Sequence, residues 1–316
     1  MPATKPANLY HPDADGLARA ARVIAEGGTV AVPTETVYGL AARADDDAAV
    51  AAIYRAKGRP DFNPLIVHVP GIAAAERLAV FDDRARRLAA AFWPGALTMV
   101  LPRRDDAALA AAVSAGLPTV ALRCPSHPVM QALLRECGLP LAAPSANRSG
   151  GVSPTSAAHV AASLGSRVDL ILDGGETERG IESTIVALRD GGGWQVLRPG
   201  PVTEAQVAEI LGPASDATAP AARIEAPGQM TSHYAPGKPV RLNAKEAVEG
   251  EFMIGFGPIA GDISLSPSAD LAEAAARLYA CLHAAADAAQ LRIAIAPVPE
   301  EGIGVAINDR LRRAAA

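Results

Sequence analysis

Cysteine is scarce in this chain of 316 residues, and the few cysteines are poorly placed for cross-linking or for holding a metal ion. Cys124, Cys137 and Cys281 are odd in number and contain no C-x-x-C pair. Such a set argues against a disulfide framework and against a thiolate zinc site. We therefore expect the three thiols to pack inside the protein as small apolar side chains.

Long apolar runs and an excess of positive charge are also missing. No run approaches the roughly 20 apolar residues of a membrane span, and the N-terminal segment MPATKPANLY lacks the apolar stretch of a signal peptide. The formal charge is -5, from 29 Lys and Arg against 34 Asp and Glu, so no global positive field attracts nucleic acid. We expect a cytoplasmic protein without membrane contact, in which any basic site is local.

The chain does have enough apolar residues for two hydrophobic cores. Half of its residues are apolar and a fifth are charged, which excludes disorder of the whole chain. Helical spacing of apolar residues is interleaved with short strand-like runs, as expected for a twisted mixed α/β sheet covered by helices. We expect helices at 13–26, 48–58, 82–92, 126–136, 155–164 and 203–211, and strands at 29–33, 65–69, 97–101, 119–123, 141–146, 170–175, 183–188 and 194–200.

A change of composition after residue 212 predicts a second domain. The segment that follows is rich in Ala, Pro, Gly and Ser and has no hydrophobic period, as a linker would be. Beyond it, strand-like runs at 239–243, 251–257 and 292–298 surround a helical pattern from about 268 to 289, and a last helix follows. We expect a first domain at 1–212, a linker at 213–236 and a small α/β domain at 237–316.

The segment 33–40, PTETVYGL, follows the first strand and is broken by Pro33 and Gly39. We expect a loop there, at the end of a buried strand. A second candidate for chemistry is KGRPDFNP at 57–64, which holds two cations and two prolines. Arg59 offers a planar fork and Lys57 a point charge, so this rigid loop could hold a phosphate or a carboxylate. Taken alone, it fits a solvated basic turn better.

The run APSANRSGGVSP at 143–154 follows an apolar strand and is crowded with small hydroxyl and amide groups. Backbone N–H groups in such a loop can surround phosphates. The loop is not a Walker motif, because G-x-x-x-x-G-K-[ST] is absent from the chain. An ordinary polar turn fits this run equally well.

Cations and a hydroxyl also stand where strands begin or end. Ser183 begins a predicted strand, Arg198 lies near the end of another, and Arg123 ends a third. Together with Arg59, the two strand-end arginines recur beside small polar groups. We interpret the set as one cleft for an anionic ligand, with independent surface positions as the open alternative.

Other kinds of site find little support. The chain contains no G-x-S-x-G elbow and no H-E-x-x-H motif, which weakens serine-hydrolase and zinc-protease interpretations. Cys124 and His127 have no second pair at a spacing that completes a tetrahedral metal site. His68 and Tyr38 stand in apolar runs, where each would ordinarily be a core residue.

Considered together, the ordered motifs resemble the YrdC-like family. The tail and the end of the linker are similar to the two-domain threonylcarbamoyl-AMP synthases of that family, and the match runs in order over almost the whole chain. The motifs are PTETVYGL (33–40), AKGRPDFNPLIVHV (56–69), PGALTMVL (94–101), VALRCPSHP (120–128), APSANRSGGVSPT (143–155), ESTIV (182–186), LRPGPV (197–202), SHYAP (232–236) and GIGVAINDRLRRAA (302–315).

The resemblance implies an enzyme that condenses L-threonine, bicarbonate or carbon dioxide, and ATP to L-threonylcarbamoyl-AMP, with release of pyrophosphate. Such an enzyme is a nucleotidyltransferase. Its product would pass to a tRNA threonylcarbamoyl transferase that modifies the adenosine beside the anticodon in tRNAs reading codons that begin with A. The implied fold is a YrdC-like sheet with a concave, positively charged cleft, a linker over that cleft and a Rossmann-like C-terminal domain. Any contact with tRNA itself would be weak.

The resemblance also assigns residues. The L-threonine site would comprise Thr36, His68, Arg123, Ala143 and Ser183, with Arg123 as the natural partner of the amino-acid carboxylate. The ATP site would comprise Lys57, Arg59, Asn63, Thr119, Ser145, Asn147, Ser153, Arg198 and Tyr234. No covalent nucleophile is expected, because threonine attacks the carbon source and the carbamate then attacks phosphorus. We expect Mg²⁺ to arrive with ATP and not in a protein cage, because no carboxylate cluster stands near the motifs.

Three alternatives are weighed against this function. One is a regulatory paralogue without activity, which the intact Lys57, Arg59, Ser145, Asn147 and Arg198 argue against. An RNA-binding module of YrdC-like fold would use the same positive cleft, although the acidic total and the lack of an aromatic platform speak against it. A carbamoyl transferase can be built on the same fold, but those chains carry acylphosphatase-like and zinc-finger segments that are missing here.

Overall fold

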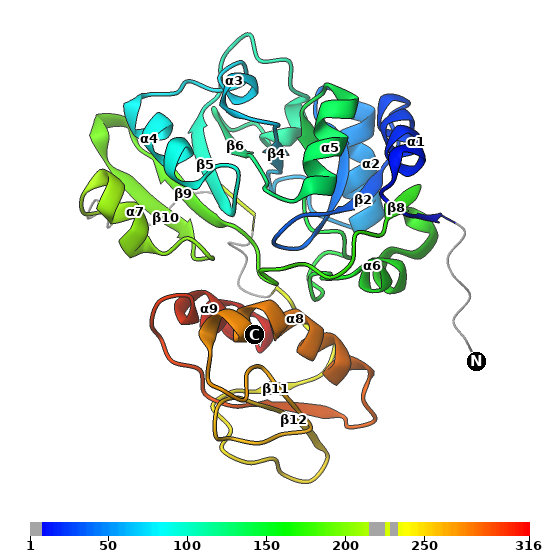
Figure 1. The fold of residues 1–316 in the computed structure, drawn as a ribbon, viewed down its shortest axis with the longest axis vertical. Helices are drawn as coiled ribbons and strands as arrows, with labels where there is room; N and C mark the ends of the chain where they lie inside the picture. The colour runs from blue at the N-terminus through cyan, green and yellow to red at the C-terminus, as the bar shows by residue number, and fades with distance from the viewer. Residues whose placement is uncertain (1–7, 215–224, 228–232) are drawn as a thin grey trace.

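The computed structural model describes residues 8–214, 225–227 and 233–316, and these form two α/β parts, each with its own sheet (Figure 1). Ten strands form the larger sheet and four form the smaller one. The two helices of the smaller part lie between its sheet and the larger part, so they face the larger domain (Figure 1). This architecture confirms the predicted fold class.

The larger sheet mixes parallel and antiparallel pairs. Its strands follow the order β1-β8-β2-β3-β7-β4-β6-β5-β9-β10, in which sequence neighbours are often separated in space. The bounds are β1 Leu9–Tyr10, β2 Val30–Pro33, β3 Tyr38–Arg43, β4 Ile66–His68, β5 Leu97–Pro102, β6 Thr119–Arg123, β7 Leu141–Ala142, β8 Leu170–Leu172, β9 Thr184–Leu188 and β10 Trp194–Arg198.

The prediction of a loop at 33–40 was wrong for residues 38–40. Residues from Tyr38 onward form β3, which pairs antiparallel with β2, so the segment is a hairpin. The sequence did not indicate this strand because its residues 38–42 are buried on both faces, which removes the alternating pattern. Thr34 holds the turn: its Oγ1 donates to the Val37 carbonyl at 2.7 Å and accepts from the Thr36 amide at 3.2 Å.

Helices begin where the sequence offers capping side chains. Asp46 accepts hydrogen bonds from the amides of Ala48 and Ala49. His127, which immediately precedes Pro128 at the start of the fifth helix, accepts a hydrogen bond at Nδ1 from the Val129 amide. The fifth helix therefore starts two residues after the predicted Ser126. The bounds are α1 Ala14–Ala25, α2 Asp47–Lys57, α3 Ile72–Ala75, α4 Asp83–Phe92, α5 Pro128–Cys137, α6 Ala157–Leu164 and α7 Glu204–Leu211.

One face of the larger sheet is only partly covered by helices. Helices α1 and α5 pack on it over β2, β3 and β8, around a core that includes Ile24, Val32 and Leu133. Further along the same face, β4, β6, β5 and β9 present a second apolar cluster, on which Ala226 lies fully buried. The described residues 225–227 of the expected linker thus contact the sheet, while 215–224 and 228–232 lie outside the described residues.

The smaller part has a four-stranded parallel sheet in the order β11-β14-β12-β13. Its core includes Ile254, Leu278, Tyr279, Ile293 and Ile307. The strands are β11 Val240–Arg241, β12 Glu251–Gly255, β13 Ile263–Ser264 and β14 Arg292–Ile295, and the helices are α8 Leu271–Asp287 and α9 Gly304–Ala314. In the described ranges, no helix has both the length and the apolar character that crossing a membrane requires.

All three cysteines are free. Cys124 and Cys281 are buried, as predicted, whereas Cys137 at the end of α5 is only half-buried and packs against the core beneath α1.

Candidate active site

The strand register places a row of polar side chains on the partly open face of the larger sheet. His68 of β4 pairs with Arg123 of β6, and Arg123 pairs with Thr98 of β5. Because alternate side chains of a strand share one face, the row before it consists of Ile66, Ala121 and Val100. Polar chemistry therefore stands at the carboxyl ends of β4 and β6, next to an apolar floor.

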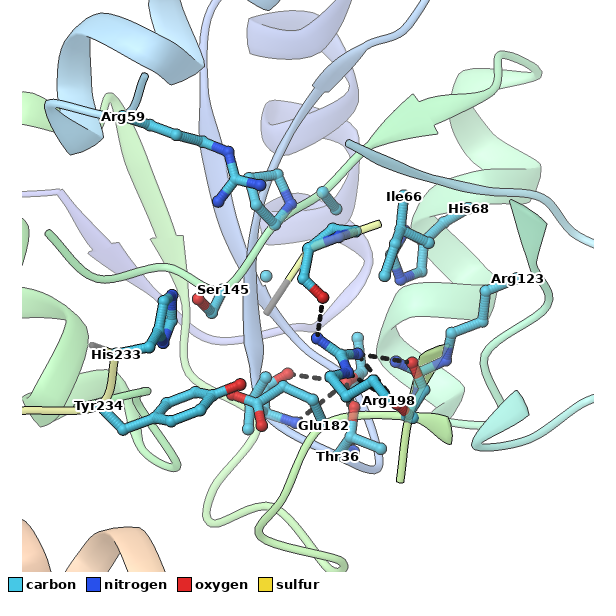
Figure 2. Close-up of a pocket in the computed structure, with 17 residues that line it drawn as sticks. Thr36, Arg59, Ile66, His68, Arg123, Ser145, Glu182, Arg198, His233 and Tyr234 are labelled. Atoms are coloured by element: carbon cyan, nitrogen blue, oxygen red, sulfur yellow. Dashed lines mark hydrogen bonds between the residues drawn. The ribbon is translucent and has the colours of Figure 1, made fainter. Parts of the chain in front are cut away.

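A cavity of about 40 Å³ opens beside this row (Figure 2). All five residues assigned to L-threonine line it, and four residues of the predicted ATP set join them, namely Arg59, Ser145, Arg198 and Tyr234. In Figure 2, His68 and Arg123 lie on one side and His233 with Tyr234 on the other. The three arginines of the proposed anionic cleft therefore do share one cavity. The predicted residues in its wall are Thr36, Arg59, His68, Arg123, Ala143, Ser145, Ser183, Arg198 and Tyr234.

Two other predicted ATP residues, Lys57 and Asn147, lie behind the cavity wall. Lys57 Nζ donates to the carbonyls of Ser145 and Asn147, both at 2.6 Å, so it ties the end of α2 to the loop after β7. The Asn147 amide group donates to the carbonyls of Arg148 and Gly151 at 2.8 and 2.9 Å, within the same loop. Lys57 and Asn147 thus shape the loop that carries Ser145.

Two further predicted ATP residues, Thr119 and Asn63, do not line the cavity. Thr119 lies on the same sheet face as Arg123, at the far end of β6, where it pairs with Pro102. Asn63 lies in the loop that Arg59 closes.

Arg59 enters the cavity because α2 ends sharply. Gly58 caps the helix at φ 60°, a left-handed conformation that glycine adopts without strain. The guanidinium then donates to the carbonyls of Asn63 and Pro64 at 3.2 and 3.0 Å. Burial lowers the pKa of Arg59 to about 10, an effect that Tyr54 partly offsets. Arg59 is therefore a fixed cation near neutral pH.

Arg198 is aimed by an irregularity in β10. The register against β9 shifts between Val196 and Arg198, as a β-bulge does when it redirects a side chain. Arg198 donates to the Ser183 carbonyl from Nε at 3.1 Å and from Nη2 at 2.9 Å, and Nη2 also reaches Ser183 Oγ at 3.2 Å. Ser183 Oγ is in turn 2.8 Å from Thr98 Oγ1. The two predicted subsites therefore meet at Ser183.

Arg123 is paired with a carboxylate that the sequence analysis did not select. Its Nη2 donates to Glu35 at 2.7 Å, both side chains are buried, and Nε donates to the Gly95 carbonyl at 3.2 Å. The other Glu35 oxygen accepts from the Ser126 amide at 3.1 Å. Burial favours the neutral form of Glu35, but Arg123 outweighs it and holds the pKa of the carboxyl below its usual value. Glu35 lies inside the motif at 33–40, so the signal for it was present.

His68 faces the cavity as a neutral imidazole. Burial, reinforced by Arg123, lowers its pKa to about 3. Within the part of the chain that the structure describes, neither ring nitrogen has a hydrogen-bond partner. An unprotonated, unpaired imidazole in a cavity wall can accept a hydrogen bond from a ligand.

Two comparisons with known proteins cover both domains. A family model described as telomere recombination matches residues 22–200, and a model described as threonylcarbamoyl-AMP synthase, C-terminal domain, matches residues 202–316. The threonylcarbamoyl-AMP synthase of Bacillus subtilis is 42% identical over 322 residues, which cover 95% of this chain and 92% of the relative. The chain belongs to the two-domain threonylcarbamoyl-AMP synthase family.

Solved structures of this synthase family agree in fold. The Sua5 protein of Pyrococcus abyssi complexed with L-threonine has a TM-score of 0.86 and 37% identity to this chain, over 95% of this chain and 94% of that one. A full-length HypF structure is only 20% identical, with a TM-score of 0.52 over 59% of this chain, so it shows a shared fold alone.

A second carboxylate that the sequence analysis missed lies in the wall of the synthase cavity. Glu182 is buried and accepts hydrogen bonds from Ser153 Oγ at 2.6 Å, from the Tyr279 hydroxyl at 2.7 Å and from Arg310 Nε at 3.2 Å. Burial opposes its ionisation, but Arg310 and Arg198 outweigh burial and lower its pKa to about 2. Ser153, a predicted ATP residue, thus meets the cavity through Glu182.

Positive charge prevails among the buried groups of this region, although the whole chain is acidic. Such an arrangement suits anionic reactants, because fixed cations in a site shielded from water act more strongly than at the surface. In the described residues, no group of three His, Cys, Asp or Glu side chains could hold a metal ion. The buried cations are Lys57, Arg59, Arg123, Arg198 and Arg310, and the carboxylates are Glu35 and Glu182.

Proposed function

We propose that this chain forms L-threonylcarbamoyl-AMP from L-threonine, bicarbonate or carbon dioxide, and ATP, and releases pyrophosphate as a nucleotidyltransferase. The observation that carries the proposal is the placement of Arg59, Arg123 and Arg198 around one cavity, in a member of the threonylcarbamoyl-AMP synthase family. The P. abyssi relative, which shares the fold, was solved with L-threonine. The product would be the intermediate that a tRNA threonylcarbamoyl transferase consumes in the cytoplasm.

The first step joins the threonine nitrogen to the carbon source. Arg123 would receive the threonine carboxylate, and Thr36 and Ser183 offer hydroxyl groups nearby. His68, neutral and unpaired among the described residues, can accept a hydrogen bond from the threonine ammonium or hydroxyl group. The threonine ammonium first loses a proton to solvent; the free amine then attacks carbon dioxide, a C–N bond forms as one C=O π bond breaks, and a second proton passes from nitrogen to solvent, which gives an N-carboxylate. Fixing both reactants in one cavity supplies the proximity for this step.

The second step is nucleotidyl transfer. A carbamate oxygen attacks the α-phosphorus of ATP, and the bond to the β-phosphate oxygen breaks to release pyrophosphate. Arg59 and Arg198 would stabilise the charge on the phosphates, and Mg²⁺ would arrive bound to ATP. A cavity of about 40 Å³ holds about one or two water molecules. ATP is larger than this space, so the cavity must widen when ATP binds.

A labelling experiment tests the proposed product. The protein is incubated with ATP, Mg²⁺, L-threonine and ¹³C-bicarbonate, and the nucleotides are analysed by mass spectrometry. The proposal predicts an adenylate that carries threonine and one ¹³C atom. Conversion of ATP to ADP and phosphate, or an adenylate without the label, would contradict it. Salt-dependent RNA binding in the absence of any adenylate would favour the RNA-binding alternative.

A further inference from the structure

One arginine of the last helix contacts three segments that form the cavity. Arg310 of α9 is fully buried. Its Nη1 donates to the Pro199 carbonyl at 2.8 Å, its Nε donates to Glu182 at 3.2 Å, and its guanidinium carbon lies 5.6 Å from the centre of the Tyr234 ring. These partners belong to three of the motifs that carry the family resemblance. A single side chain of the C-terminal domain therefore joins parts of the site that are far apart in sequence.

Glu182 transmits this contact to the cavity. One carboxylate oxygen accepts from Arg310 and from the hydroxyl of Tyr279 on α8, and the other accepts from Ser153 Oγ. The C-terminal domain thus orients one end of the carboxylate, while the other end orients a serine predicted to bind ATP. Glu182 itself is in the cavity wall, whereas Arg310 is not.

Tyr234 is held by Arg310 and Tyr279, the two residues of the C-terminal domain that also contact Glu182. Its backbone has φ 64°, a left-handed conformation that is uncommon for a bulky side chain and persists only where surrounding contacts impose it. The Tyr234 ring stacks on Tyr279 with centroids 5.4 Å apart and an angle of 28°, and Arg310 lies over it. Contacts from α8 and α9 therefore hold this predicted ATP residue in place.

We propose that Arg310 is a positioning residue for the ATP site. Through Glu182 it fixes Ser153, and through direct contact it fixes Tyr234 and the Pro199 carbonyl that follows Arg198. The C-terminal domain thereby completes a nucleotide site whose other residues lie in the first domain and in the linker. This inference rests on the proposed function, because it assigns a role within that reaction.

Arg310→Lys tests the proposal, because it keeps the positive charge and removes the planar fork that serves several partners at once. We expect the KM for ATP to rise about tenfold or more, with the KM for L-threonine within about twofold, since an interaction with one substrate changes mainly that substrate's binding. Arg312→Lys is the matched control. It makes the same change on the same helix, at an exposed side chain whose partner is Glu300. The control should leave both constants unchanged.

A double-mutant cycle tests whether Arg310 acts through Glu182. Arg310→Met alone leaves a buried carboxylate unpaired, so folding of each variant is checked by thermal unfolding. The double variant Arg310→Met with Glu182→Gln removes both charges. If Arg310 acts through Glu182, the double variant weakens binding of a non-hydrolysable ATP analogue no more than the worse single variant does. Independent roles would instead multiply the two effects.

Several results would overturn the proposal. They are an ATP KM in Arg310→Lys equal to that of Arg312→Lys, an equal rise in the KM values of both substrates, or multiplied effects in the cycle. Failure of the proposed function itself would look different, because the unaltered protein would then form no adenylate. Binding of the ATP analogue would still report on Arg310 in that case.

Discussion

Arg123 is held from two sides before any substrate arrives. Glu35 and the Gly95 carbonyl each accept one of its hydrogen bonds. A guanidinium has five N–H donors, so donors remain for a substrate carboxylate. Glu35 fixes the plane of the fork, and the charge of the pair is neutral until an anion is added. The side chain is therefore preorganised for a carboxylate.

Arg123→Ala should weaken the binding of L-threonine far more than the binding of ATP. Without its partner, the amino-acid carboxylate and Glu35 would lie in the same buried region uncompensated, which is costly. We expect the KM for L-threonine to rise by about 100-fold or more and the KM for ATP by about threefold at most, measured by initial rates of pyrophosphate release. Arg104→Ala, at an exposed arginine paired with Asp106, is the control. Equal changes for both substrates would show that Arg123 does not bind threonine.

Sequence patterns predicted the arginines of the site better than its carboxylates. A cation at a strand end beside small polar groups indicates an anion site by its chemistry alone. The roles of Glu35 and Glu182 depend on partners that come from far away in the chain, namely Ser126 for the first and Arg310 for the second. Both glutamates stand inside motifs, but no local pattern shows which distant residue each of them contacts.

At the scale of elements, Gly200, two residues after the end of β10, lies against the start of β9. A Cβ built on Gly200 would lie 2.4 Å from the Thr184 amide nitrogen and 2.7 Å from the Ser183 carbonyl carbon. Backbone atoms cannot yield at those distances. The chain after Arg198 can therefore return beside the start of β9 only because residue 200 has no side chain.

Gly200→Ala should separate these strands and displace Arg198. We expect the free energy of unfolding to fall by about 1–3 kcal/mol, measured by urea denaturation, because overpacking forces the backbone to shift. The KM for ATP should rise as well. Gly71→Ala is the matched control, since nothing lies within 4 Å of its Cβ position, and we expect a change within about 0.5 kcal/mol there. Equal stability of the two variants would refute the close-approach argument.

Elements with local signals were predicted well, and those without were missed. Helices α2 and α7 begin at Asp46 and Thr203, which cap them, and α2 ends at Gly58, so both match the sequence prediction closely. Strand β3 lacks such signals. Its existence depends on pairing with β2 on one side and β7 on the other, and the second partner is about a hundred residues away.

At the scale of the whole molecule, the acidic chain encloses a region rich in buried cations. This distribution favours a small anionic substrate over a nucleic acid, which needs exposed positive charge along an extended surface. Neutral histidines accompany the cations: His68 and His233 are buried, and His159 is half-buried. Burial lowers the pKa of His68 and of His233 to about 3 and that of His159 to about 4.

Because of these histidines, we expect the stability of the fold to fall with pH before the carboxylates begin to titrate. Each has a lower pKa in the folded state than the usual 6.5, so its contribution to stability is complete above pH 6.5 and is lost as the pH falls toward the folded value. For each unit by which the pH falls in this range, each histidine lowers the free energy of unfolding by up to about 1.4 kcal/mol. Between pH 6.5 and 4.5, His68→Gln should lose about 2 kcal/mol less stability than the unaltered protein.

Urea denaturation across this pH range measures the difference. His11→Gln, at an exposed histidine, serves as the control and should follow the unaltered protein. A His68→Gln curve parallel to that of the unaltered protein would mean that His68 is not buried as a neutral group.

The sequence indicated two domains and a linker but not how the domains meet. Helices α8 and α9 face the larger domain, and their side chains reach the cavity wall through Glu182 and Tyr234. Such an interface depends on complementary side chains from segments that are far apart in the sequence. Amphipathic spacing shows that a helix has a buried face, but it does not show which neighbour that face contacts.

Pyrophosphate release from ATP tests the central claim most directly. The purified protein with Mg²⁺ is assayed with L-threonine and bicarbonate together, with each omitted in turn, and with L-serine in place of L-threonine. The account predicts release that requires both the amino acid and bicarbonate, and is reduced with L-serine. Release that proceeds with neither, or no release in any mixture, would contradict a cavity built to join threonine, a carbon source and ATP.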